Sequence, residues 1–150
     1  MQVDRRRLVA AGTLMGIGLG GFVDGILFHQ LLQIHNMLSN WVPRTTLVNE
    51  QINMFWDGVF HSFTWVMTVI AVAMLWRVCK RSTRELSGRT YFAALLLGWG
   101  IFNVVEGLLD HEILQVHHVY QNGNFLVWDL VFLCFGLLLI AIGILIIRAD

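Results

Sequence analysis

The sequence predicts an all-α membrane protein with four transmembrane helices. Hydrophobic residues make up 57% of the 150 positions and charged residues only 13%, a composition typical of membrane proteins. The apolar residues fall into four runs, each longer than the roughly 20 residues that cross a bilayer as a helix. A polar motif in the first run returns in the third. We therefore expect a single transmembrane domain, residues 1–150, that contains two helical-hairpin repeats.

The four apolar runs are separated by more polar segments. A soluble bundle would need polar stripes along its helices, and the second half of each run lacks them. A net charge of zero argues against a nucleic-acid partner, so the bilayer is the expected surrounding. The predicted transmembrane helices are roughly Leu8–Ile34, Ile52–Trp76, Tyr91–Val116 and Phe125–Ile147.

The positive charges predict how the helices are oriented. Basic residues lie before the first run, between the second and third runs, and after the fourth; only Arg44 lies on the opposite side. Because cytoplasmic loops are enriched in Lys and Arg, both termini are expected to be cytoplasmic. Each hairpin has an even number of spans, so the two hairpins should have the same, parallel orientation in the membrane.

The repeat is the strongest signal in the chain, because polar residues and glycines rarely match by chance. The two hairpins, about residues 8–78 and 90–148, would be related by a pseudo-two-fold axis along the membrane normal. In the first and third runs the matched pairs are Gly16/Gly98, Gly18/Gly100, Asp24/Glu106, Gly25/Gly107, His29/His111, Gln33/Gln115 and His35/His117. In the second and fourth runs they are Trp56/Trp128 and Asp57/Asp129.

Ionisable residues concentrate in the half of the bundle farther from the termini. Seven acidic residues and all six histidines lie there and in the adjoining loops, with one arginine. Buried unpaired carboxylates are costly, so bound cations, shared protons or Asp–His pairs must neutralise them. The candidate metal ligands are Asp24, His29, Asp57, His61, Glu106, Asp110 and His111. Four further residues are expected to be additional ligands or to orient the ligands by hydrogen bonds: His35, His117, His118 and Asp129.

Helical spacing refines these expectations. Asp57 and His61 are four residues apart and share one helical face, as chelating pairs do. Asp24 and His35, eleven apart, share a face if the first helix continues that far. Asp24 and His29 point about 140° apart on an ideal helix, so one ion binds both only if the helix is distorted. Carboxylates are expected to lie deep, beneath a more superficial layer of histidines.

Three motifs resemble those of a known family. They are G-F-V-D-G-I-L-F-H-Q, F-W-D-G-V-F-H and V-V-E-G-L-L-D-H-E-I-L-Q-V-H-H-V. The chain from about Met15 to Ile146 resembles an uncharacterised family of bacterial four-helix membrane proteins, domain of unknown function 2243. The resemblance implies a location in the bacterial inner membrane. It implies no particular activity.

Several functions are compatible with these residues. The first is a metal site, expected to be dinuclear, that holds zinc, iron, manganese or copper for redox or hydrolytic chemistry. The same ligands could deliver a metal to a respiratory enzyme. Alternatively, His29 and His111 could ligate one haem of a b-type cytochrome, with Gly25 and Gly107 clearing space for it. A metal-free proton relay or transporter could use the same side chains. The sequence is compatible with a membrane-protein partner and with a homodimer.

Overall fold

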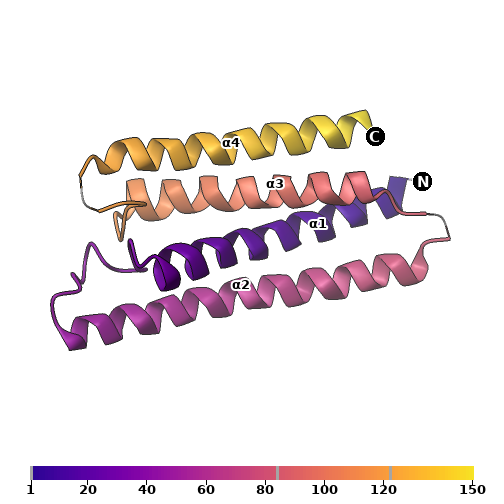
Figure 1. Ribbon diagram of the computed structural model, residues 1–150. Coiled ribbons are helices and arrows are strands. Elements are labelled where there is room, and N and C mark those ends of the chain that lie inside the picture. Colours follow the sequence, from indigo (N-terminus) through magenta and orange to yellow (C-terminus); the bar gives the residue numbers. More distant parts are fainter. Residues whose placement is uncertain (1, 84, 122) are drawn as a thin grey trace.

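The protein is a bundle of long helices joined by loops (Figure 1). The computed structural model describes residues 2–83, 85–121 and 123–150. Two of the long helices continue into a π-helix, a wider helix with i→i+5 hydrogen bonds. The elements are α1 (Gln2–Val23), η1 (Asp24–Leu31), α2 (Leu47–Arg81), α3 (Gly88–Glu106), η2 (Gly107–Ile113) and α4 (Phe125–Ala149), where η denotes a π-helix.

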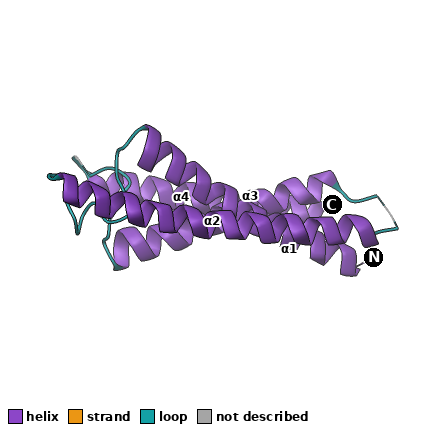
Figure 2. Ribbon diagram, turned by 90° about the horizontal axis from the view of Figure 1, so that it is seen from below, coloured by secondary structure: helices purple, strands orange, loops and turns teal. Residues whose placement is uncertain are grey.

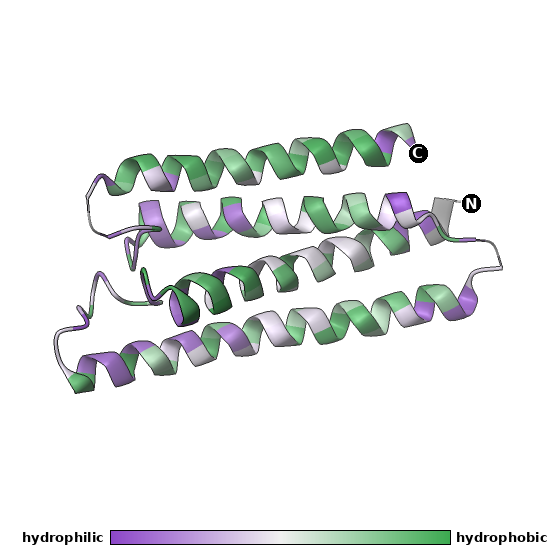
Figure 3. Ribbon diagram, viewed as in Figure 1, coloured by the Kyte–Doolittle hydropathy of each residue, from purple (hydrophilic) through white to green (hydrophobic). Residues whose placement is uncertain are grey.

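The described residues include four helical segments long and apolar enough to cross a membrane, which confirms the predicted number. Hydropathy colouring shows α4 as hydrophobic along almost its whole length (Figure 3). The second segment is longer than predicted and extends at both ends. The four segments are Arg5–Leu31, Leu47–Arg81, Gly88–Ile113 and Phe125–Ala149.

The helices are packed in the order α2, α1, α3, α4, with α1 and α3 in contact at the centre (Figures 1 and 2). Both termini lie at one end of the bundle (Figure 1). The loop 32–46 and the described residues of the loop after η2, 114–121, lie at the other end (Figure 1). There the Asn40 backbone N–H donates to the Val116 carbonyl at 2.9 Å, which joins the two loops.

Close contact between α1 and α3 depends on two glycines. A Cβ atom at Gly16 would lie 2.1 Å from the carbonyl oxygen of Leu95, and one at Gly98 would lie 1.9 Å from that of Thr13. Only glycine permits helix backbones to approach so closely, and this is a common use of small residues between membrane helices. The contact holds α1 against α3 and so sets how the π-helices that continue them are placed relative to each other.

Side-chain caps define where α2 and α3 begin. Thr46 accepts a hydrogen bond from the Asn49 backbone N–H at 3.2 Å, and Ser87 accepts one from the Thr90 N–H at 3.0 Å. Ser87 also donates to the carboxylate of Asp150 at 2.5 Å, which fixes the end of α4 to the start of α3. The end near the termini is thereby closed by polar contacts outside the spanning segments.

Candidate metal centre

The π-helices place a carboxylate beside a histidine five residues later. In η1, Asp24 Oδ2 lies 3.1 Å from His29 Nε2. At the start of η2, Glu106 Oε1 lies 3.6 Å from His111 Nε2. An α-helix would point these pairs far apart, but i→i+5 winding brings them to one face. The distortion that joint binding would require is therefore present in both segments.

A sharp turn follows each π-helix and carries a second histidine back over the helix end. Gln33 and Gln115 have φ angles of 51° and 50°, in the left-handed region that non-glycine residues rarely adopt. The prediction that the first and third helices continue to residues 34 and 116 is therefore wrong. His35 and His117 approach the carboxylates from loops. The expectation that they share a helical face with Asp24 and Glu106 is therefore wrong.

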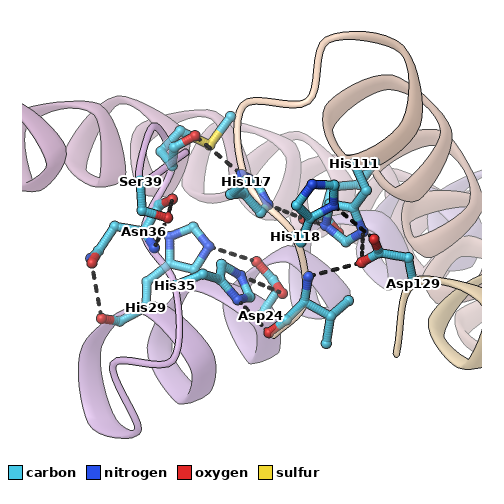
Figure 4. A network of polar contacts seen from close by, with 12 residues as sticks. Asp24, His29, His35, Asn36, Ser39, His111, His117, His118 and Asp129 are labelled. Atoms are coloured by element: carbon cyan, nitrogen blue, oxygen red, sulfur yellow. Dashed lines mark hydrogen bonds and ion pairs between the residues drawn. The ribbon is translucent and has the colours of Figure 1, made fainter. Parts of the chain in front are cut away.

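Four histidine rings gather at this point, and each is at most 1% exposed. His35 and His117 stack with ring centroids 4.7 Å apart and planes only 7° from parallel. The ring of His29 lies 4.6 Å from that of His35, and the ring of His111 lies 4.8 Å from that of His117. The close-up in Figure 4 shows the rings converging between η1, η2 and the two loops. The expected superficial layer of histidines is thus buried at the level of the carboxylates.

Backbone carbonyls fix the tautomers of the two loop histidines. His35 Nδ1 lies 2.9 Å from the carbonyl oxygen of Val119, and His117 Nδ1 lies 3.1 Å from that of Met37. A carbonyl oxygen can only accept, so in both rings Nδ1 carries the proton. In the neutral rings, Nε2 therefore has a free lone pair.

The two π-helix histidines are supported by carboxylates on the outer helices. His29 Nδ1 lies 2.9 Å from Asp57 Oδ1 on α2, and His111 Nδ1 lies 3.3 Å from Asp129 Oδ1 on α4. Both carboxylates are almost fully buried. A histidine that binds metal through one nitrogen commonly donates its other N–H to a carboxylate or carbonyl in this way.

In the described part of the chain, the four Nε2 atoms face two carboxylates, and no other residue donates a hydrogen bond to them. His35 Nε2 lies 3.9 Å from Asp24 Oδ1, and His117 Nε2 lies 3.3 Å from Glu106 Oε1. Lone pairs and carboxylate oxygens repel one another unless a cation or proton lies between them. Among the described residues, the cluster's buried atoms without a hydrogen-bond partner include Asp24 Oδ2, Glu106 Oε2 and the Nε2 atoms of His29, His35 and His111.

Two overlapping sets of side chains have the spacing of metal ligands. Their ligand atoms all lie within 4.8 Å of one another within each set, and every residue is buried. His117 belongs to both sets. Within the described chain the sets are His29, His35 and His117, and Glu106, His111 and His117.

Burial favours the neutral form of the loop histidine His35, which lies outside the spanning segments. Burial lowers the pKa of His35 well below its ordinary value of 6.5, and the neighbouring His117 and His29 act in the same direction. A neutral imidazole at pH 7 keeps the Nε2 lone pair that a metal requires.

Three predicted ligands lie away from the converging Nε2 atoms. His61 Nδ1 contacts the carbonyl oxygen of Asp57 at 2.8 Å, and its ring fills the space beside Gly25. Asp110 lines a cavity between α2 and α3. The carboxylate of Asp57 faces the back of His29 and has the position of a supporting residue.

The remaining predicted residues occupy supporting positions. His118 Nδ1 lies 2.7 Å from Asp129 Oδ2, so both lie behind His111. Gly107 faces the side chain of Leu133, as Gly25 faces His61. These two glycines therefore accommodate side chains of the outer helices.

Sequence reasoning missed three supporting groups. Asn36 donates to Asp57 Oδ2 at 2.6 Å, and the Met37 backbone N–H donates to Asp57 Oδ1 at 2.8 Å. The Val119 N–H donates to Asp129 Oδ1 at 2.9 Å. Backbone groups leave no residue-type signal. For Asn36 the sequence did contain a signal: Asn36 directly follows His35, just as His118 directly follows His117 in the matched segment.

The fold and the cluster together define a class of protein: a four-helix membrane protein with buried histidines and carboxylates at one end. The model of the family described as "Predicted membrane protein (DUF2243)" matches residues 11–150, and the chain belongs to this family. The resemblance seen in the motifs is thereby confirmed. No curated protein and no solved structure matches the chain.

Proposed function

We propose that the protein is an integral membrane metalloprotein with a dinuclear centre. The ligands of the two divalent transition-metal ions would be four histidine Nε2 atoms and two carboxylates. Imidazole and carboxylate ligands together suit zinc, iron, manganese or copper(II). The proposed ligands are Asp24, His29, His35, Glu106, His111 and His117.

One observation carries this proposal: four histidine Nε2 atoms and two carboxylates face one another in a buried space, and no other described residue donates a hydrogen bond to them. The Nδ1 atoms of His29, His35 and His117 are already hydrogen-bonded to acceptors, and that of His111 lies 3.3 Å from Asp129 Oδ1. Protonating several Nε2 atoms would crowd positive charges into the same volume. Metal ions satisfy all six groups at once, and the acceptors behind the rings strengthen the ligands.

Burial favours a resident centre over metal delivery. All six proposed ligands are at most 6% exposed, and the two loops cover them. A delivery protein needs ligands that its partner can reach. We therefore infer that the metal stays bound and serves redox or hydrolytic chemistry, as metal pairs do when they activate a substrate or water.

The alternatives have less support. In the haem alternative, the group would lie between His29 and His111, but the rings of His35 and His117 lie within 6.4 Å of both. A proton relay across the membrane would need titratable groups along the whole span. No charged residue lies between Arg7 and Asp24 in the first span.

We also infer that the chain consists of two hairpin repeats related by a pseudo-two-fold axis. Gln33 and Gln115 occupy matched places in sequence and share the same rare backbone conformation. His35 contacts the backbone of the second half, and His117 contacts that of the first. The proposed repeats are about residues 8–78 and 90–148, within one domain.

The proposed location is the bacterial inner membrane, with both termini in the cytoplasm. Of the nine basic residues that the structure describes, eight lie in the parts of the helices near the end of the bundle that the termini share, and Arg44 lies in the loop at the other end. Basic residues are retained on the cytoplasmic side, so the metal centre would lie toward the opposite face.

Metal content tests the proposed function. The protein is purified in mild detergent, and its metals are determined by mass spectrometry together with an absorption spectrum. About two equivalents of a transition metal per chain, without a Soret band, is the expected result for a dinuclear centre. Iron with a Soret band would favour the cytochrome, and a folded protein that binds no added metal would contradict both.

Replacing Asp57 with asparagine should weaken metal binding about 10- to 100-fold, the usual effect of losing a group that supports a ligand. Both Asp57 oxygens accept hydrogen bonds, from His29, Asn36 and Met37, and an amide would turn a donor toward one of these donors. Competition with a calibrated chelator measures the affinity. The control is Glu50→Gln, an exposed carboxylate on the same helix. Equal weakening by both variants would refute the supporting role.

Removing the metal with a chelator should lower the midpoint of thermal unfolding. Without the cation, one buried oxygen of each carboxylate, Asp24 Oδ2 and Glu106 Oε2, is left without a hydrogen-bond partner. Metal at about 1,000 times its dissociation constant stabilises a protein by about 4 kcal/mol. Metal added back should restore the midpoint. Identical unfolding curves with and without metal would show that no metal binds the folded state preferentially.

A further inference from the structure

A cavity of about 440 Å³ reaches the metal centre from the side of the bundle, between α2 and α3. Its volume lies within the roughly 300–1,000 Å³ of known small-molecule sites. One end is formed by the acidic residues Glu106 and Asp110, and Glu106 is a proposed metal ligand. Its aromatic walls are formed by Trp56, Phe60, Phe63 and Phe102.

The cavity opens where the bundle would face lipid. In the described part of the chain, no Cα atom of α2 lies within 8 Å of one in α3. Val59, Phe63 and Val105 line the gap and are exposed, on helices long enough to cross a membrane. A molecule dissolved in the bilayer could therefore enter this cavity without passing through water.

Asp110 gives the inner end of the cavity an unused acceptor. Its half-buried carboxylate has no hydrogen bond or ion pair with any described residue. In the first repeat, Phe28 occupies the matched position. A second cavity, of about 620 Å³ along α1 and α3, has no acidic residue in its lining. The carboxylates therefore distinguish the α2–α3 cavity.

We propose that the substrate of the metal centre is a lipid-soluble molecule with an apolar body and a hydroxyl end. It enters from the bilayer through the α2–α3 cavity, and its hydroxyl donates to Asp110 beside Glu106. The aromatic walls hold the apolar body, and the unpartnered carboxylate selects a donor. That the bound molecule is a substrate rests on the proposed metal centre; that the cavity binds it does not.

Photolabelling in a bilayer tests this inference. The probe is a long-chain alcohol that carries a diazirine, added to the full-length protein in lipid nanodiscs, with labelled residues mapped by mass spectrometry. Saturable labelling of α2 and α3 residues around the cavity is expected, and excess cetyl alcohol should compete with it. A hydrocarbon probe of the same length without the hydroxyl should label these residues much less.

Two variants localise the binding. Val105→Trp fills the cavity and should abolish saturable labelling, whereas Val23→Trp, at the matched position on the second cavity, should not. Asp110→Leu should weaken binding about tenfold, as expected for a lost hydrogen bond to a charged group.

The same samples are analysed for metal, which separates this inference from the proposed function. Labelling spread evenly over the lipid-facing helices, or unchanged in Val105→Trp, overturns the cavity proposal even when metal is present. Cavity labelling that Val105→Trp abolishes, in a protein that binds metal, supports it. A protein without metal overturns the proposed function and the assignment of the bound alcohol as its substrate.

Discussion

Replacing His117 with alanine is expected to remove nearly all bound metal. His117 is common to both sets of closely spaced ligands, and its Nε2 lone pair binds one ion, so its loss leaves that ion one ligand short and leaves a gap in the buried centre that both ions share. The effect should exceed the roughly 10- to 100-fold weakening expected for supporting residues such as Asp57. Metal content after gel filtration, measured by mass spectrometry, gives the result directly.

The matched control is His61→Ala. His61 is also a histidine of the same end of the bundle, but its Nδ1 contacts a backbone carbonyl and its ring packs beside Gly25. Metal content should be unchanged in this variant. Loss of metal in His61→Ala together with retention in His117→Ala would show that the chelating pair predicted from spacing, Asp57 and His61, is the true site.

Replacing Gly98 with alanine should cause the largest loss of stability. The added Cβ atom would lie 1.9 Å from the backbone oxygen of Thr13, which cannot move without shifting α1. Overpacking commonly costs about 1–3 kcal/mol, and a clash with backbone should reach at least the upper end. Unfolding in mixed micelles, followed by circular dichroism, measures the change in free energy.

A glycine without such a contact provides the comparison. Gly58 lies in α2, and a Cβ atom there would meet no atom within 4 Å. Gly58→Ala should stabilise the helix by about 0.5–1 kcal/mol, because alanine loses less backbone entropy than glycine. If Gly98→Ala were equally harmless, the close packing of α1 against α3 would be wrong. Metal content should also fall in Gly98→Ala, since this packing sets how η1 and η2 are placed relative to each other.

The helices could be predicted from the sequence because hydrophobic runs determine spans in a bilayer. Their ends could not. The first and third runs remain apolar to Ile34 and Val116, yet the helices end at Leu31 and Ile113. The π-helices and the left-handed Gln33 and Gln115 arise from tertiary contacts that hydrophobicity does not report.

Several residues of the buried cluster could be predicted, but their arrangement could not. The repeat indicated Asp24, His29, Glu106 and His111, because polar residues that match between two apolar runs rarely do so by chance. His35 was expected to be secondary, since it lies near a loop. The chain reversal that brings His35 and His117 to the centre depends on backbone conformation, which a helical projection cannot represent.

X-ray absorption spectroscopy of the purified protein tests the central claim most directly. At the edge of the bound metal, we expect nitrogen and oxygen neighbours at about 2.0–2.2 Å, with the outer-shell scattering of imidazole rings. The signal should contain at least two histidines per ion and disappear in His117→Ala. Sulfur neighbours at about 2.3 Å, or no bound metal in folded protein, would contradict a histidine–carboxylate centre.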